Sequence, residues 1–290
     1  MLRVWLARHG QTVWGDEDRF CGRTDLELSE RGYAQAEALA RRLAAEPLVA
    51  VYASPLRRAL ATAEAVARSQ GLPVEALEGL VEMDFGRWEG LARDDVRRAS
   101  PDRYLRWCED PAAVSPEGGE GAYEVAQRAL AALHHVLASH RAGAVLVVAH
   151  RTVNRILLCH YLDVPIRAYR ERLGQDLCAL NLLEVADGRV RLSLLNSTEH
   201  LRYMPTASAP HCPSAYPGRG VPNQRRPETV NRKLLTSCRL GDNLNINRFM
   251  RLCLRIPDRL DAKPDIGPCS VCLFAGGSTN DSKTKDYQRY

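Results

Sequence analysis

Lysine is absent from the first 203 residues of this 290-residue chain, where arginine alone provides the basic side chains. All four lysines lie later, at Lys233, Lys263, Lys283 and Lys285. The chain also lacks an apolar run approaching the roughly 18 residues that a membrane-spanning helix requires. Its first residues lack the basic and apolar regions of a signal peptide. We therefore expect no membrane partner and a cytoplasmic location.

A regular cysteine framework is missing too. The chain has nine cysteines, and five of them lie after residue 203. An odd number without a repeated spacing favours reduced thiols over disulfides. Cys269 and Cys272 have the spacing of half a zinc site, but no second pair of suitable spacing accompanies them. We expect no metal site.

The two parts of the chain differ in charge. Residues 1–203 contain 26 basic and 28 acidic side chains, whereas residues 204–290 contain 14 and 7. The boundary near Tyr203 is followed by a segment, 204–210, whose prolines and small residues are typical of a linker. We expect a folded domain over 1–203 and a basic extension of low order over 204–290. Read-through beyond about Tyr203 is one hypothesis for its origin. The extension lacks interleaved arginines and aromatics, so nucleic acid is not an expected partner.

Apolar runs alternate with amphipathic segments over residues 1–203. The pattern predicts strands at 2–7, 48–52 and 144–149, and helices at 29–45, 54–70, 123–140 and 153–162. It also predicts a helical segment at 91–109 in two pieces, broken at Pro101. Ser54-Pro55 favours a helix start, because serine can cap and proline fits the first helical position. Asp187-Gly188 predicts a hairpin between 177–185 and 190–195. The alternation predicts an α/β fold, a three-layer α/β/α sandwich with a mostly parallel central sheet.

Two histidines each follow a predicted strand. His9, with Arg8 beside it, follows the first strand, and His150 follows the run 144–149. Ligands of open α/β sheets bind just beyond the C-terminal ends of the strands. We therefore expect both imidazoles at one site, where a neutral histidine can act as a nucleophile.

Several motifs surround these histidines in a characteristic order. They are Arg8-His9-Gly10-Gln11-Thr12, Ser54-Pro-Leu-Arg-Arg58-Ala-Leu-Ala-Thr62-Ala63, Leu80-Val-Glu82-Met-Asp-Phe-Gly86-Arg-Trp-Glu-Gly90, Val147-Val-Ala-His150 and Asn196-Ser-Thr-Glu-His200-Leu201. The set resembles the histidine phosphatase superfamily, in the branch shared with phosphoglycerate mutases. The resemblance covers residues 2 to about 203.

The resemblance implies one role for each central residue. His9 is expected to be the nucleophile that accepts the phosphoryl group. Arg8 and Arg58 would clamp the phosphoryl oxygens with guanidinium forks suited to phosphate, and His150 would donate to the same oxygens. Glu82 would protonate the leaving oxygen and later take a proton from the attacking water.

The assignments of Arg58 and Glu82 each have alternatives nearby in the sequence. Spacing alone does not choose between Arg57 and Arg58, and the resemblance selects Arg58. Asp84 and Glu89 lie close to Glu82 in the sequence. We expect Glu89 to fix the turn around Gly86 and Gly90 rather than to act as the acid.

The substrate loop departs from the pattern that the resemblance implies. Gly15 stands where many members have an asparagine, and Arg151 follows His150 where glycine is common. Arg151 either widens the anionic footprint or faces solvent. Cys21 and Gly22 take the place of substrate-contacting residues, although Cys21 is also compatible with loop packing. Thr12 completes the expected substrate-binding set.

The short segment from Glu82 to His150 lacks the longer insertion of the mutases. The resemblance therefore implies a metal-independent phosphomonoester hydrolase that acts through a phosphohistidine intermediate, with no cofactor. Its substrate would be a small phosphorylated metabolite, such as a sugar phosphate, a phosphoglycerate-type compound or α-ribazole phosphate. A phosphoglycerate mutase and a non-catalytic phospholigand-binding protein stay open as alternatives. A homodimer is a further option.

Overall fold

Six strands form one mixed sheet in the computed structural model, which describes residues 1–15, 17–202 and 204. The strand order is β3-β2-β4-β1-β5-β6. The strands are β1 (Leu2–Arg8), β2 (Leu48–Ala53), β3 (Val74–Ala76), β4 (Gly143–Ala149), β5 (Leu180–Ala186) and β6 (Arg189–Ser197). The first four are parallel, whereas β5 and β6 add an antiparallel hairpin at one edge. The order expected of residues 205–290 lies outside the described residues.

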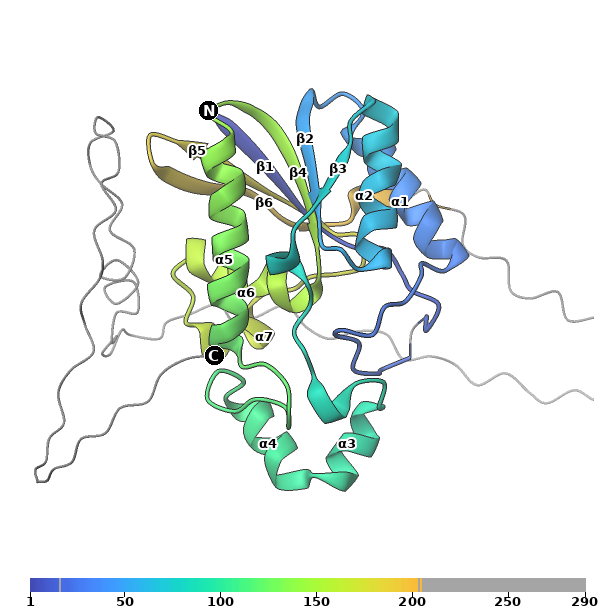
Figure 1. Ribbon diagram of the computed structural model, residues 1–290, viewed down its shortest axis with the longest axis vertical. Helices are drawn as coiled ribbons and strands as arrows, with labels where there is room; N and C mark the ends of the chain where they lie inside the picture. Colours follow the sequence, from blue (N-terminus) through green and yellow to red (C-terminus); the bar gives the residue numbers. More distant parts are fainter. Residues whose placement is uncertain (16, 203, 205–290) are drawn as a thin grey trace, which may run out of the picture. The chain divides into compact units, whose positions relative to one another are not determined.

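Helices cover both faces of this sheet (Figure 1). They are α1 (Glu30–Leu43), α2 (Arg57–Gln70), α3 (Arg93–Ala99), α4 (Pro101–Glu109), α5 (Ala122–Ser139), α6 (Arg151–Tyr161) and α7 (Tyr169–Arg172). The pair α1 and α2 lies on one side, and α5 and α6 lie on the other. The predicted α/β sandwich is confirmed. No helix in the described part of the chain is long and apolar enough to cross a membrane.

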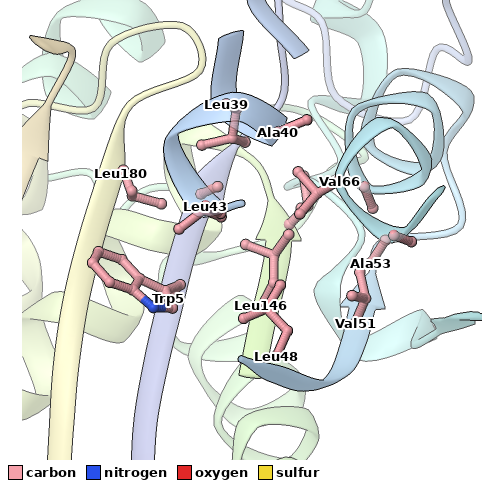
Figure 2. Packing of buried hydrophobic residues seen from close by; sticks show 14 of the residues in the cluster. Trp5, Leu39, Ala40, Leu43, Leu48, Val51, Ala53, Val66, Leu146 and Leu180 are labelled. Atoms are coloured by element: carbon pink, nitrogen blue, oxygen red, sulfur yellow. The ribbon is translucent and has the colours of Figure 1, made fainter. Parts of the chain in front are cut away.

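One apolar cluster fills the space between the sheet and the α1–α2 layer (Figure 2). Trp5 and Leu146 come from neighbouring strands, Leu39 and Leu43 from α1 and Val66 from α2, and each is at most 3% exposed. Burying one such side chain contributes about 1.5–3 kcal/mol. The packing fixes the two central strands, and with them the loops that leave their C-terminal ends.

The helix starts show where local sequence decides the structure. At α1, Ser29 caps the helix and its side chain accepts a hydrogen bond from the Gly32 N–H, as serine does at this position. At α2, the predicted start at Ser54 is wrong: the helix begins at Arg57, and Leu56 caps it without a side-chain bond. The Ser54 hydroxyl lies 2.7 Å from His150 Nε2 and also accepts from the Leu56 N–H at 3.4 Å. The serine thus bonds a distant histidine as well as the backbone just before the helix.

Candidate active site

His9 and His150 meet at the C-terminal edge of the sheet. Strands β1 and β4 are parallel neighbours, with Arg8 opposite Ala149, so the residue after each strand reaches the same place. The His9 N–H donates to the Ala149 carbonyl at 3.1 Å. The two imidazole rings are 5.1 Å apart between centroids and tilted by 57°. The structure thus brings together the two histidines that follow the central strands.

The His9 ring is oriented by the backbone carbonyl of the next residue, Gly10. Its Nδ1 lies 2.7 Å from the Gly10 carbonyl oxygen. A carbonyl only accepts hydrogen bonds, so Nδ1 holds the proton and Nε2 has the free lone pair. Burial, followed by the positive charges of Arg58 and Arg8, lowers the pKa of His9 well below its usual value. The imidazole is therefore neutral at neutral pH, the form in which it is a nucleophile.

Two arginines lie against this histidine with part of their hydrogen-bonding capacity unused. Arg58 is completely buried and donates to the carbonyls of Thr24 and Gly22, both at 2.7 Å. Arg8 donates to the Gln175 carbonyl at 2.7 Å. In each arginine the Nε atom is buried without a hydrogen-bond partner among the residues described. Burial and Arg151 lower the pKa of Arg8 to about 9, which leaves it charged at neutral pH.

The neighbouring Arg57 has a different environment. Its side chain is 55% exposed and forms ion pairs with Asp25 and Glu27. The structure therefore separates two adjacent arginines that spacing could not: Arg58 lies at the site and Arg57 lies on the surface.

His150 is completely buried and bonded through one ring nitrogen. Its Nε2 lies 2.7 Å from the Ser54 hydroxyl oxygen. Its Nδ1 has no hydrogen-bond partner in the described part of the chain. Burial, then the charges of Arg58, His9 and Arg8, lower its pKa well below the usual value. A neutral imidazole with one unused nitrogen results.

Glu82 is a buried carboxylate at the same site. It is only 4% exposed, and its two oxygens accept hydrogen bonds from the backbone N–H groups of Met83 and Thr152, at 2.8 and 3.0 Å. Thr152 belongs to α6, directly after His150 and Arg151, so the contact ties the carboxylate to the histidine loop. Arg128 also donates to the Glu82 backbone carbonyl at 3.1 Å.

The two rival carboxylates are occupied elsewhere. Asp84 accepts a hydrogen bond from the Gly86 N–H at 2.7 Å, within its own turn. Glu89 accepts bonds from the backbone N–H groups of Gly22, Arg23 and Phe85, and from the Thr24 hydroxyl. Glu89 thus holds the 22–24 loop whose carbonyls receive Arg58.

An open cavity of about 840 Å³ lies at this site, and the completely buried Arg58 and His150 are not among its wall residues. Its walls include Arg8, His9, Glu82 and three of the expected substrate-binding residues, Thr12, Cys21 and Arg151. Gly22 is not a wall residue, and its carbonyl accepts a hydrogen bond from Arg58. Burial raises the pKa of Cys21, which favours its protonated thiol form.

The cavity also contains residues that sequence reasoning missed. They are aromatic and basic side chains from α3, α4, α6 and α7, among them Arg93, Tyr104, Trp107, Arg155, Tyr169 and Arg170. Helices α3 and α4 lie beyond the strand ends (Figure 1), so this wall comes from segments distant in the sequence. Only Arg155 had a local signal: it follows Arg151 by four residues and so shares its helix face. Among the described residues, no three metal-ligating side chains lie close enough to hold an ion.

Comparison with known proteins assigns the family. The model of the histidine phosphatase superfamily (branch 1) matches residues 4–198. The chain belongs to this family. The predicted resemblance is therefore confirmed over nearly all of the residues that suggested it.

Its relatives include several named phosphatases. Phosphoserine phosphatase 1 of Hydrogenobacter thermophilus is 33% identical over 201 residues, which cover 69% of this chain and 95% of the relative. The adenosylcobalamin/α-ribazole phosphatase of Salmonella typhimurium is 29% identical, and the match covers 68% of this chain and 96% of the relative. The solved structure of a mycobacterial glucosyl-3-phosphoglycerate phosphatase matches with a TM-score of 0.63 at 31% identity. The match covers 68% of this chain and 99% of that chain. The chain spans about half (55%) of longer mycobacterial relatives. The protein is a phosphatase of the histidine phosphatase type, as predicted.

Proposed function

We propose that this phosphatase hydrolyses small phosphomonoesters through a phosphohistidine formed at His9. In the first step His9 Nε2 attacks phosphorus, the ester P–O bond breaks, and the leaving oxygen takes a proton from Glu82. In the second step water attacks the phosphohistidine while the Glu82 carboxylate accepts its proton. Inorganic phosphate leaves, and His9 and Glu82 return to their initial states.

The observation that supports this proposal most is a set of unused donors around His9. Arg8 Nε, Arg58 Nε and His150 Nδ1 are all buried without a partner in the described chain. Leaving a buried polar atom unpaired costs about 1–3 kcal/mol, so three at one place suggest a ligand that pairs them. A phosphoryl group has the oxygens to do so, and its transfer depends chiefly on positioning and charge stabilisation.

The bond between Ser54 and His150 is compatible with the tautomer that this role requires. The Ser54 oxygen accepts from the Leu56 N–H at 3.4 Å, and the role requires the Ser54 hydroxyl to donate its proton to His150 Nε2. In that arrangement Nδ1 holds the imidazole proton and can donate it in a hydrogen bond to a phosphoryl oxygen.

The substrate is proposed at the level of its class. The names of the relatives refer to phosphoserine, α-ribazole and glucosyl-3-phosphoglycerate, which share only a phosphate on a small molecule. We expect turnover in the presence of chelator, because the guanidinium groups of Arg8 and Arg58 supply the positive charge at the phosphoryl group. A cytoplasmic location and a homodimer stay predictions from the sequence.

Phosphate release by the purified full-length protein in chelator tests the proposal, with a panel of phosphomonoesters as substrates. His9→Ala is expected to abolish release, whereas the matched control His135→Ala, on the exposed face of α5, is expected to retain it. Isomer formation from 3-phosphoglycerate without net release would favour a mutase. Release that persists in His9→Ala would contradict the proposal.

A further inference from the structure

The outer charges of the cavity neutralise one another. Near its mouth Arg19 pairs with Glu17, and Arg93 pairs with Asp18. Arg93 also lies over the Phe20 ring, 4.7 Å from its centroid. These ion pairs link residues within the 17–20 loop and link the loop to α3. They leave little net charge on this part of the cavity wall.

Two further arginines of the cavity, the exposed Arg151 and the half-buried Arg155, have no such partners among the described residues. Arg151 and Arg155 lie one turn apart on α6 and both line the cavity. Neither forms an ion pair with a carboxylate within the described chain, in contrast to Arg19 and Arg93. The Arg155 Nε is buried and lacks a hydrogen-bond partner there. Burial, followed by the charge of Arg151, lowers the pKa of Arg155 to about 10.

A third arginine faces the same space from α7. The Arg170 guanidinium stacks on the Trp107 ring, 3.7 Å from its centroid, and donates to the Trp107 carbonyl at 3.4 Å. Both residues line the cavity. The stacking fixes the guanidinium plane in the way that aromatic faces do, while leaving other N–H groups unused.

The cavity has more arginines than one phosphoryl group needs as partners. A phosphate monoester has a charge of about −1.5 to −2 at neutral pH, which Arg8 and Arg58 match. Arg151, Arg155 and Arg170 are further cationic groups of the same cavity, and in the described chain none of them forms an ion pair with Glu82, Glu171 or Asp176, the acidic residues that also line it. Concentrated like charges are unfavourable unless an anion binds between them.

We infer that Arg151, Arg155 and Arg170 form a subsite for a second anionic group, a carboxylate or a second phosphate, on the alcohol part of the substrate. The inference rests on the proposed function and adds a substrate class to it: phosphomonoesters with a second negative charge. Guanidinium forks bind both groups in a bidentate manner.

Two pairs of substrates isolate the second charge. 3-Phosphoglycerate differs from glycerol 3-phosphate by a carboxylate in place of a hydroxymethyl group, and fructose 1,6-bisphosphate differs from fructose 6-phosphate by one phosphate. The ratio of kcat/KM within each pair is measured for the full-length protein and for Arg151→Gln/Arg155→Gln. We expect a preference for the more anionic member of at least one pair of about ten- to a hundredfold, the range expected for charge-assisted hydrogen bonds. The double variant is expected to lose it.

The control is Arg167→Gln, which removes one exposed arginine outside the cavity and is expected to keep the wild-type ratio. Because each ratio is internal to one protein sample, partial unfolding of a variant does not change it. A preference in one pair alone identifies the anion. Equal kcat/KM values in both pairs, or a preference that survives in the double variant, would overturn the subsite while leaving the proposed function standing. Absence of phosphate release from these four compounds and from the wider panel of phosphomonoesters would overturn both.

Discussion

The His9 and His150 rings lie 5.1 Å apart because Arg8 and Ala149, the last residues of two parallel strands, are in register. The contact places two buried imidazoles among arginines, and both pKa values fall well below the usual value. Neutral histidines are what a phosphoryl acceptor and a hydrogen-bond donor require. The same pairing has a measurable consequence for stability.

Acid is expected to destabilise the fold through these two histidines. The unfolded chain binds protons at histidine near pH 6.5, whereas in the folded state both rings stay neutral to well below that pH. The free energy of unfolding therefore falls as the pH drops below about 6.5, by about 1.4 kcal/mol per pH unit for each histidine. It changes little from this source above that pH. Denaturant titrations between pH 5 and about 8 measure the slope.

His150→Gln is expected to make this slope shallower, because one of the two groups is gone. The exposed His135→Gln serves as the control and is expected to keep the wild-type slope. Identical slopes for the wild type and His150→Gln would contradict the origin proposed for the effect.

Glu82→Gln tests the proton donor through the leaving group. An alkyl alkoxide needs a proton to leave, so turnover of an alkyl phosphate is expected to fall by about 10²- to 10⁴-fold. p-Nitrophenolate leaves unprotonated, so p-nitrophenyl phosphate is expected to lose much less in the phosphorylation step, measured as the burst rate. Asp84→Asn, whose side chain still accepts from Gly86, is the control. Equal losses for both substrates would argue against Glu82 as the acid.

Ser54→Ala removes the hydroxyl that bonds His150. The buried Nε2 is then unpaired, and we expect a loss of about 1–3 kcal/mol in the free energy of unfolding together with a reduced kcat/KM. Ser69→Ala, which loses a hydroxyl bonded to the Val66 carbonyl in the same helix, is expected to leave kcat/KM unchanged. Thermal melts and phosphate-release assays separate the two effects. A Ser54→Ala variant with wild-type kcat/KM would contradict a positioning role.

Gly22→Ala is expected to damage the site more than Gly15→Ala. A Cβ at Gly22 would overlap the Met83 carbonyl and the Glu89 carboxylate, so the loop whose carbonyl receives Arg58 has to move. A Cβ at Gly15 meets nothing within 4 Å, and its cost is limited to the strain of φ +59°, about 1 kcal/mol. The kcat/KM values of the two variants relative to the wild type test this expectation. A larger loss in Gly15→Ala than in Gly22→Ala would show that the loop does not position Arg58.

The sequence predicted the parts of the site that follow a strand or stand in a motif. His9, Arg8 and His150 come directly after buried strands, and the parallel pairing of those strands brings them together. Arg58 required the resemblance, because its burial against Gly22 and Thr24 depends on a loop packed over α2. Nothing local separates it from Arg57.

The start of α2, the cavity wall and the pairing of β5 depend on tertiary contacts. The sequence Ser54-Pro55 is typical of a helix start, yet the Ser54 hydroxyl is hydrogen-bonded to the buried His150. Trp107 and Arg170 are ordinary members of short helices in the sequence, and only the fold stacks one on the other at the cavity wall. The mostly parallel sheet was predicted from alternating strands and helices. The antiparallel pairing of β5 with β1 could not be predicted in this way, because hydrophobic periodicity does not show which strands become neighbours.

The covalent intermediate at His9 is the central claim, and trapping it tests the claim most directly. The full-length protein is mixed with a turned-over phosphomonoester, quenched in alkali within one turnover, digested, and searched for phosphorylated peptides by mass spectrometry. We predict an acid-labile phosphoryl group on His9, at Nε2, and none in His9→Ala. Turnover that proceeds at the wild-type rate in His9→Ala, or a phosphoryl group that accumulates on another residue during turnover, would contradict the account.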